Sequence, residues 1–234
     1  MKNKRIHLLH PATVFLYLTL LLAVASWITS IYVNDGVENM LSPEGIRWLL
    51  RHVLPNYLHT PALGIVCIMF FGLGLAHYTR LLQAYKTFFT SPQQLTRKET
   101  HTLYVATICL FIYLLFLASI TVGPFTLLQS ATGTLVHSPF ADGFIFLLSL
   151  GIAIASIIYG YGTQQLHTDK DIIAGMSCLY IKYNTYFVTL FSIVLFFSSL
   201  SYSQLIHILD INAIFIQYLF HTCCYLPFFI KKWR

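Results

Sequence analysis

Apolar residues fall into six long runs along this 234-residue chain, and short polar stretches separate the runs. A helix needs about 20 apolar residues to cross the hydrocarbon core of a bilayer, and each run is long enough for such a helix. The six predicted spans are residues 12–33, 61–81, 102–123, 141–163, 182–203 and 211–230. The pattern therefore predicts an all-α integral membrane protein, in which residues 1–234 form a single polytopic membrane domain.

Lys and Arg residues in the polar stretches predict the orientation of the spans, because basic loops stay on the cytoplasmic side. With the N-terminus inside, twelve of these residues lie inside and two lie outside. The inside residues are Lys2, Lys4, Arg5, Arg80, Lys86, Arg97, Lys98, Lys170, Lys182, Lys231, Lys232 and Arg234, and the outside ones are Arg47 and Arg51. Both termini are therefore predicted to be cytoplasmic. The first run is longer than the apolar core of about 7–15 residues in a signal peptide, so we expect a retained helix.

Two local patterns predict where helices begin. Ser42 is a typical N-cap residue, and it is followed by a proline at the first helical position, Pro43, and an acid in the first turn, Glu44. They predict a short helix near residues 43–57, which either lies at the outer interface or leads into the second span. Thr96 with Glu99 three residues later is a capping box, which predicts the start of the third helix.

Composition supports the membrane assignment and excludes several classes of function. Charged residues make up 9% of the chain, hydrophobic residues 57%, and the mean hydropathy is +0.70. The formal charge of +6 comes from residues at the ends of apolar runs, so we expect a lipid bilayer and no nucleic acid as partner. The five cysteines show neither a CxxC pair nor zinc-ligand spacing, and we expect reduced apolar fillers, no metal site and no cofactor.

Ionisable side chains deep inside a span are costly and often functional, so they are the candidate site residues. Only His77, near the inner end of the second span, and His221, near the middle of the sixth, meet this criterion. Either histidine could relay protons, although a neutral histidine bonded to a neighbouring helix is the commoner arrangement. No GxSxG, HExxH or phosphate-binding glycine loop is present, so we do not expect an enzyme. A membrane enzyme that uses His77 or His221 remains a third alternative.

Small residues predict where helices approach closely. Gly72 and Gly74 lie in the second span, and Gly151, Ala153 and Ala155 lie in the fourth. Small side chains let the backbones of membrane helices come into contact. We therefore expect these positions to form packing faces and not to bind substrate.

Several ordered sequence blocks together resemble one family of membrane proteins. The blocks are His10-Pro11-Ala12-Thr13-Val14-Phe15-Leu16, Leu41-Ser42-Pro43-Glu44-Gly45-Ile46-Arg47-Trp48-Leu49, Pro61-Ala62-Leu63-Gly64-Ile65, Ser138-Pro139-Phe140-Ala141-Asp142-Gly143 and Asp169-Lys170-Asp171 through Met176-Ser177. In this order they resemble the AbgT family of p-aminobenzoyl-glutamate transporters. The resemblance covers about two thirds of this chain and less than half of a full-length family member.

The resemblance implies an inner-membrane protein that is dimeric and moves aminobenzoyl-glutamate or sulfonamide-like antimetabolites, driven by an ion or proton gradient. It also implies two re-entrant hairpins and broken helices around the substrate. The chain departs from this pattern, because Gly72-Leu73-Gly74-Leu75-Ala76 leads through residues 80–94 directly into a block that resembles a much later junction. The second hairpin's Gly-Ser-Ala-Ser-Ala-Lys-Trp type run has no counterpart near His221-Thr222-Cys223-Cys224. No substrate-binding residue of the family can therefore be assigned here.

Two hypotheses follow. In the first, the chain is a shortened transporter of p-aminobenzoyl-glutamate or related small anionic aromatic compounds, and several copies assemble a pathway that one copy cannot form. In the second, it is a degenerate, non-transporting scaffold or a partner subunit of a larger transporter. Both imply a multi-pass protein of the inner membrane that forms a homodimer or a hetero-oligomer.

Overall fold

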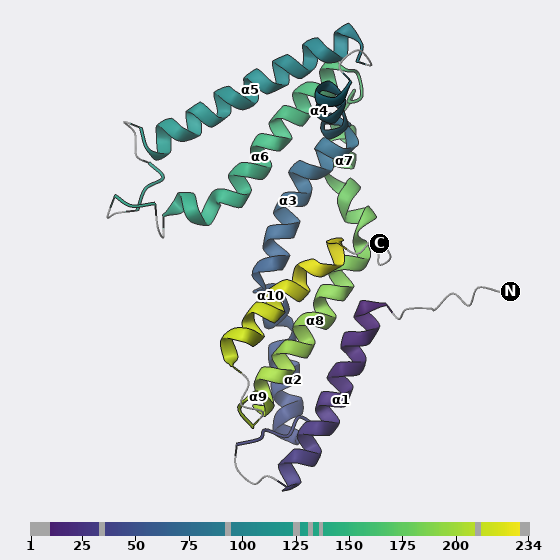
Figure 1. The fold of residues 1–234 in the computed structure, drawn as a ribbon, viewed down its shortest axis with the longest axis vertical. Coiled ribbons are helices and arrows are strands. Elements are labelled where there is room, and N and C mark those ends of the chain that lie inside the picture. The colour runs from purple at the N-terminus through teal and green to yellow at the C-terminus, as the bar shows by residue number, and fades with distance from the viewer. Residues whose placement is uncertain are drawn as a thin grey trace, which may run out of the picture. The chain divides into compact units, whose positions relative to one another are not determined.

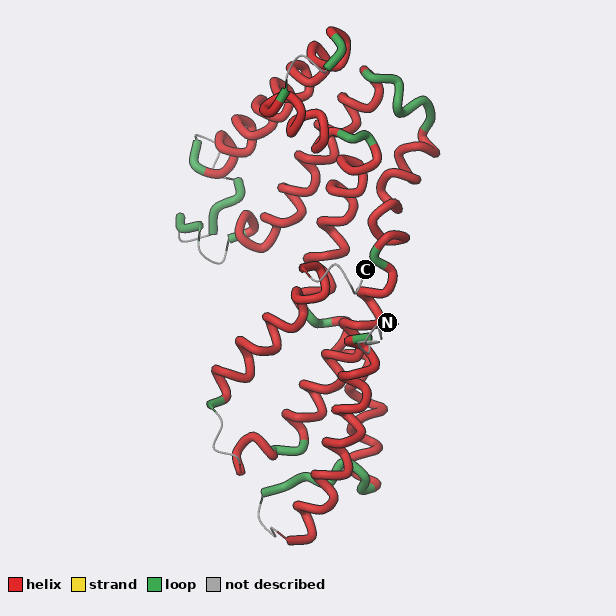
Figure 2. The backbone as a smooth tube through the Cα atoms, turned by 45° about the vertical axis from the view of Figure 1, so that its right-hand side comes forward, coloured by secondary structure: helices red, strands yellow, loops and turns green. Residues whose placement is uncertain are grey.

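A computed structural model describes residues 10–32, 36–91, 95–123, 127–130, 133–135, 138–208 and 212–229. Within these residues the chain forms helices and loops and no strand (Figure 2). The helices are α1 (Pro11–Tyr32), α2 (Pro43–Leu58), α3 (Pro61–Tyr78), α4 (Leu81–Thr90), α5 (Arg97–Thr121), α6 (Pro139–Gly162), α7 (Asp169–Lys182), α8 (Asn184–Tyr202), α9 (Leu205–Ile208) and α10 (Ala213–Phe229). The predicted all-α fold is confirmed.

Five helical stretches among the described residues are long and apolar enough to cross a membrane. They are Pro11–Tyr32, Pro43–Tyr78, Arg97–Thr121, Pro139–Gly162 and Asn184–Tyr202. The second stretch joins α2 and α3, which only His59 and Thr60 separate. The predicted sixth span corresponds to α10, whose 17 residues fall short of the about 20 that a span needs. The count of six spans stays a prediction. So does the cytoplasmic placement of both termini, since residues 1–9 and 230–234 lie outside the described residues.

Contacts within the chain group its residues into two compact units. Unit 1 comprises Met1–Gly64 and Tyr183–Arg234, and unit 2 comprises Ile65–Lys182. The prediction of one membrane domain over residues 1–234 stays a prediction.

In unit 1, helix α8 is the central element and packs against α1, α2 and α10. Helices α1 and α8 lie side by side and run in the same direction (Figure 1). The ring of Phe15 on α1 lies 5.8 Å from that of Phe196 on α8. Helix α2 contributes Trp48, which stacks on Tyr202 at a ring distance of 4.3 Å. Aromatic contacts therefore supply much of the packing around α8.

In unit 2, helices α5 and α6 form an antiparallel pair (Figure 1). One end of this pair packs with α3 and α4 in a core of small and large apolar residues. The buried members are Ala76, Leu81, Ala84, Leu103, Ala106, Ala155 and Tyr159. Alanines at this end let the helices approach closely, so the pair is tight here.

The predicted helix starts are confirmed by the caps that the structure shows. Ser42 Oγ accepts a hydrogen bond from the Gly45 amide, and α2 begins at Pro43. Thr96 and Glu99 form the reciprocal capping box, so α5 begins at Arg97, five residues before the predicted span. A further serine cap, Ser138, begins α6.

The structure corrects the chain's path between the spans at two places. Residues 81–90 form α4, which was not predicted, and the left-handed backbone of Arg80 (φ 56°) separates it from α3. The second predicted span therefore ends at Tyr78 and not at residue 81. Residues 169–182 form the separate helix α7, so the predicted span 182–203 begins at Asn184.

Candidate functional site

The last turn of α3 and the last part of α7 bring three reactive side chains together. His77 Nε2 lies 2.9 Å from Lys182 Nζ, and His77 Nδ1 lies 3.8 Å from Cys178 Sγ. Cys178 and Lys182 are four residues apart, so they occupy one face of α7. His77 and Lys182 are exposed and Cys178 is half-buried, which leaves this cluster accessible.

Hydrogen-bonding rules determine the state of the His77 ring in this arrangement. A lysine ammonium group can only donate, so His77 Nε2 must accept from Lys182. The ring is then neutral and carries its proton on Nδ1, which faces the Cys178 sulfur. A second proton on His77 would remove the acceptor that Lys182 uses. The cluster can therefore couple the position of Lys182 to the binding of a proton or an anion.

The second histidine predicted as a candidate lies in a different environment. His221 is exposed on α10, and its ring lies 5.6 Å from that of Phe220. No hydrogen bond joins it to another described residue. His77 belongs to unit 2 and His221 to unit 1. A functional role for either histidine stays a prediction. Of the two, only His77 has a charged neighbour within hydrogen-bond distance in the described part of the chain.

Side chains from two other helices bond to the backbone of α3. Ser149 Oγ on α6 accepts from the Gly72 amide at 3.1 Å and donates to the Ile68 carbonyl at 2.6 Å. Tyr180 on α7 donates its hydroxyl proton to the Cys67 carbonyl at 2.6 Å. Sequence reasoning missed these bonds, although the glycines in α3 indicated that close approach was possible.

The packing role predicted for the small residues is confirmed. A Cβ atom on Gly72 would lie 2.3 Å from the Ser149 carbonyl oxygen, and one on Gly74 would lie 2.7 Å from the Gly175 carbonyl oxygen. On α6, a Cβ atom on Gly151 would lie 2.8 Å from the Tyr113 ring. Ala153 and Ala155 are buried. These positions therefore allow the close approach of the helices.

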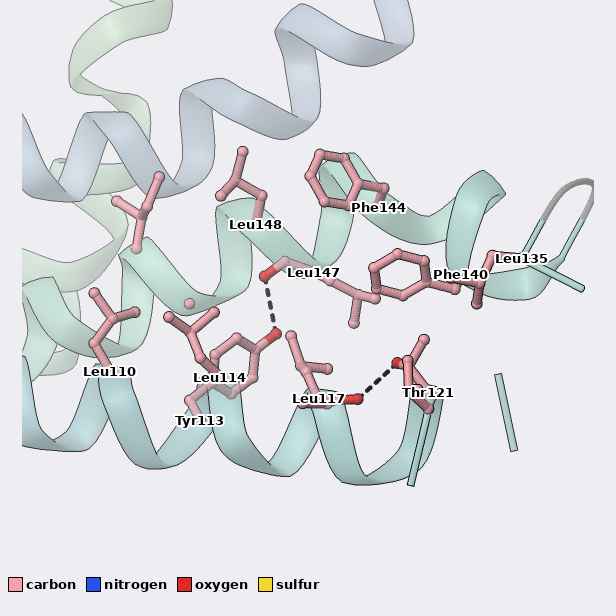
Figure 3. Close-up of a pocket in the computed structure, with 14 residues that line it drawn as sticks. Leu110, Tyr113, Leu114, Leu117, Thr121, Leu135, Phe140, Phe144, Leu147 and Leu148 are labelled. Atoms are coloured by element: carbon pink, nitrogen blue, oxygen red, sulfur yellow. Dashed lines mark hydrogen bonds between the residues drawn. The ribbon is translucent and has the colours of Figure 1, made fainter. Parts of the chain in front are cut away.

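An apolar space in unit 2 lies between α5 and α6 (Figure 3). We call it the α5–α6 groove. It has a volume of about 430 Å³ and is lined by Leu110, Tyr113, Leu114, Leu117, Ala118, Thr121, Val122, Leu135, Phe140, Phe144, Leu147, Leu148, Gly151 and Ile152. Its volume falls within the range of about 300–1,000 Å³ that is typical of small-molecule pockets.

No group of three or more His, Cys, Asp or Glu side chains in the described residues could hold a metal ion. The cluster of His77, Cys178 and Lys182 offers one imidazole and one thiol, together with a lysine. A zinc site uses at least three ligands from Cys, His, Asp and Glu, so this cluster does not meet that requirement.

The sequence model of the AbgT family of transporters matches residues 4–92 and 86–220. The chain belongs to the AbgT family. Together the two matched segments cover both units, so the family assignment extends over nearly all of the described residues. With its several apolar helices, this AbgT chain is a multi-pass protein of the inner membrane.

A curated relative is similar over a shorter segment. The p-aminobenzoyl-glutamate transport protein of Escherichia coli (strain K12) is 35% identical over an alignment of 85 residues, and the match covers 32% of this chain. The match spans only 17% of that relative.

Two solved structures share the fold. The YdaH transporter of Alcanivorax borkumensis superposes with a TM-score of 0.73 at 15% identity, over 86% of this chain and 72% of that chain. MtrF of Neisseria gonorrhoeae, whose structure illuminates a class of antimetabolite efflux pumps, superposes with a TM-score of 0.76 at 15% identity. This match covers 86% of this chain and 70% of MtrF. At this identity the likeness shows the fold alone. The family and both neighbours are transporters or efflux pumps.

Proposed function

We propose that this AbgT chain transports p-aminobenzoyl-glutamate or a related small anionic aromatic compound across the inner membrane. The observation that carries the proposal is the family match over residues 4–92 and 86–220. The name of the Escherichia coli relative supports the choice of substrate. We infer a transporter and not an enzyme, because family members and structural neighbours are transporters or efflux pumps.

The His77–Lys182 pair fits this substrate class. Lys182 places a positive charge next to the accepting Nε2 atom of His77. An anionic substrate that approaches Lys182 competes with His77 for the ammonium protons, and the freed imidazole nitrogen can then take up a proton. Substrate and proton binding at this cluster would thus be linked.

We further propose that the working unit is an oligomer. The family matches in two segments that overlap at residues 86–92, which is the pattern that loss of an intervening segment produces. A transporter builds its pathway from discontinuous helices that line a cavity, and such elements are expected from the resemblance but cannot be assigned in this sequence. A second copy or a related subunit would have to complete the pathway.

The experiment is uptake into proteoliposomes that contain the purified full chain. Radiolabelled p-aminobenzoyl-glutamate is the probe, with an imposed proton gradient, an imposed sodium gradient or neither. We expect saturable uptake with one gradient, and a large loss of uptake for Lys182→Met. The matched control is Lys170→Met in the first turn of α7, which removes an exposed lysine outside the cluster. No uptake above empty liposomes under any gradient and in either direction would overturn the proposal.

A second candidate is a partner subunit that transports nothing by itself. It is favoured by the membrane-spanning helices α1 and α8, which contain no Asp, Glu, Lys, Arg or His in their described sequences. Purification from native membranes distinguishes the two functions. Co-purification of a full-length transporter, together with inactive isolated protein, supports the subunit function. Isolated protein that transports without any recovered partner excludes it.

A further inference from the structure

The α5–α6 groove opens onto an exposed apolar surface of unit 2. Several of its lining residues are themselves exposed, including Leu114 at 51%, Phe144 at 46% and Leu148 at 42%. Beside them, the outer face of α5 carries a continuous set of exposed apolar side chains: Ile108, Phe111, Ile112, Leu115 and Phe116. In a membrane protein such a surface contacts acyl chains. The groove is therefore a recess in the lipid-facing surface and not a closed internal cavity.

The side chains that line the groove offer no free hydrogen-bond donor to a ligand. Its two hydroxyl groups are used within the protein, since Tyr113 donates to the Leu147 carbonyl at 2.8 Å and Thr121 donates to the Leu117 carbonyl at 2.6 Å (Figure 3). The sequence contains no Lys or Arg between Lys98 and Lys170. A carboxylate ligand placed here would lose its hydration and gain no partner, which is strongly unfavourable. The groove cannot be the binding site for the anionic substrate proposed above.

Water is also a poor occupant, because an ordered water needs two to four polar partners and the lining residues are almost all apolar. An empty recess would in turn leave its walls without van der Waals contacts on one side. Material that is apolar, narrow and flexible restores these contacts without needing a hydrogen bond. In the bilayer, acyl chains meet this description and are present at high concentration next to the groove.

We propose that the α5–α6 groove binds one acyl chain of a membrane phospholipid as a resident lipid. Ala118 on α5 and Gly151 on α6 are the two smallest of its lining residues, so both helices leave room for a chain at these positions. The aromatic rings of Phe140 and Phe144 pack 5.8 Å apart where the α6 side of the groove begins. The chain extends along the space between the helices and fills the gap that remains where α5 and α6 separate. This inference rests on the groove alone and does not depend on transport.

The test uses the full chain in phosphatidylcholine vesicles that contain a small fraction of phospholipid with a photoreactive diazirine on its acyl chain. After illumination, lipid adducts are located by peptide mass spectrometry. We expect adducts to be enriched several-fold on residues 110–122 and 140–152 compared with the exposed face of α1. Ala118→Phe fills the groove and should lower these adducts several-fold, whereas Leu115→Phe on the outer face of α5 should leave them unchanged. Thermal unfolding of both variants verifies that they are folded.

Two results would overturn the proposal. Equal labelling of α1, α5 and α8 would show that the groove is no different from the rest of the lipid-facing surface. A lack of adducts in the groove, combined with disulfide-linked dimers of a Leu114→Cys variant in the bilayer, would show that a second copy covers it. The unmodified chain, which keeps its native cysteines, is the background control for the dimer measurement.

Discussion

The Ser149 hydroxyl on α6 accepts a hydrogen bond from the Gly72 amide on α3, at 3.1 Å. The same hydroxyl donates to the carbonyl of Ile68, which is the residue four positions before Gly72. The hydroxyl therefore bridges the Gly72 amide and the Ile68 carbonyl, which are the donor and the acceptor of one turn of α3. Because Gly72 has no side chain, the backbone of α6 reaches this turn directly. This crossing joins α3 to the α5–α6 pair.

Gly72→Ala should destabilise unit 2. The added Cβ atom would lie 2.3 Å from the Ser149 carbonyl oxygen, so the two backbones must separate. Overpacking of this kind costs about 1–3 kcal/mol in the free energy of unfolding. Gly64→Ala on the same helix is the matched control, because nothing lies within 4 Å of its added Cβ atom. Thermal unfolding in detergent compares the two variants, and an equal midpoint for both would contradict the packing that we describe.

Ser149→Ala should destabilise the protein less than Gly72→Ala does. The variant keeps the close crossing but loses both hydrogen bonds of the hydroxyl. Interhelical hydrogen bonds in membrane proteins contribute about 0.6 kcal/mol on average and up to about 1.7 kcal/mol. Because the Ser149 hydroxyl both accepts and donates a hydrogen bond, we expect the loss of stability to lie toward the upper end of this range. Ser149→Cys has a side chain of similar shape with a weak S–H donor. We therefore expect it to recover part of the stability that Ser149→Ala loses in the same unfolding measurement.

Gln164→Gly should stabilise the protein. Gln164 follows α6 in a left-handed conformation (φ 61°), and the Gln165 amide bonds to the Gly160 carbonyl at 2.8 Å, as in a Schellman motif. A residue with a side chain pays a penalty of about 1–2 kcal/mol in this conformation, and glycine does not. The greater freedom of glycine in the unfolded chain offsets part of the gain. We expect a higher unfolding midpoint, and a lower one would show that the Gln164 side chain makes a contact that matters.

The long helices and their starting points could be predicted because their signals are local. Apolar runs of sufficient length indicate the spans, and Ser42 and Thr96 carry caps within three residues of the groups that they bond. Helix α4 gives no such signal, since Arg80 precedes it without a side-chain cap. Helix α7 did carry one, because Thr168 and Asp171 have the spacing of a capping box.

The candidate site could be predicted only in part. His77 was identified because an ionisable group inside an apolar span is unusual, but its partner Lys182 lies 105 residues away in the sequence. No spacing rule connects positions at such a separation. The α5–α6 groove likewise depends on where two helices diverge, which the pattern of apolar residues does not show because α5 is apolar on nearly every face.

A double-mutant cycle should detect a direct interaction between His77 and Lys182. The variants are His77→Ala, Lys182→Ala and the combination, each compared with the natural chain by its free energy of unfolding. Since both side chains are exposed, we expect a coupling energy of less than about 1 kcal/mol, and it should weaken if His77 is protonated. Arg80→Ala combined with His77→Ala provides a control pair for which no bond between the two side chains is described. Equal coupling in both cycles would contradict a specific bond.

The N-terminus of α7 should lose stability in acid because of Asp171. Hydrogen bonds from the backbone amides of His167 and Thr168, at 2.8 and 2.9 Å, lower the pKa of the Asp171 carboxyl below its ordinary value. When the folded-state pKa is lower than the unfolded one, the carboxylate stabilises the fold above the unfolded pKa, which is about 4 for aspartate. This stabilisation disappears as the pH falls through the lower, folded-state pKa. Stability of α7 should therefore be constant above about pH 5 and decrease below about pH 4.

Hydrogen–deuterium exchange of residues 167–175, corrected for the intrinsic pH dependence of exchange, measures this effect in the full chain. Asp171→Asn is the matched control, because the amide has a similar shape and does not titrate. Its protection should be lower than that of the natural chain at neutral pH, since the charge-assisted bonds to the two amides are weakened. Its protection should also change less between pH 5 and pH 3 than that of the natural chain. An unperturbed aspartate titrates near pH 4, between these two values, and asparagine does not titrate. If α7 of the natural chain instead becomes better protected as the pH falls, the pH dependence has the opposite sign to the one expected. That result would rule out the Asp171 carboxylate as the group that stabilises this helix end.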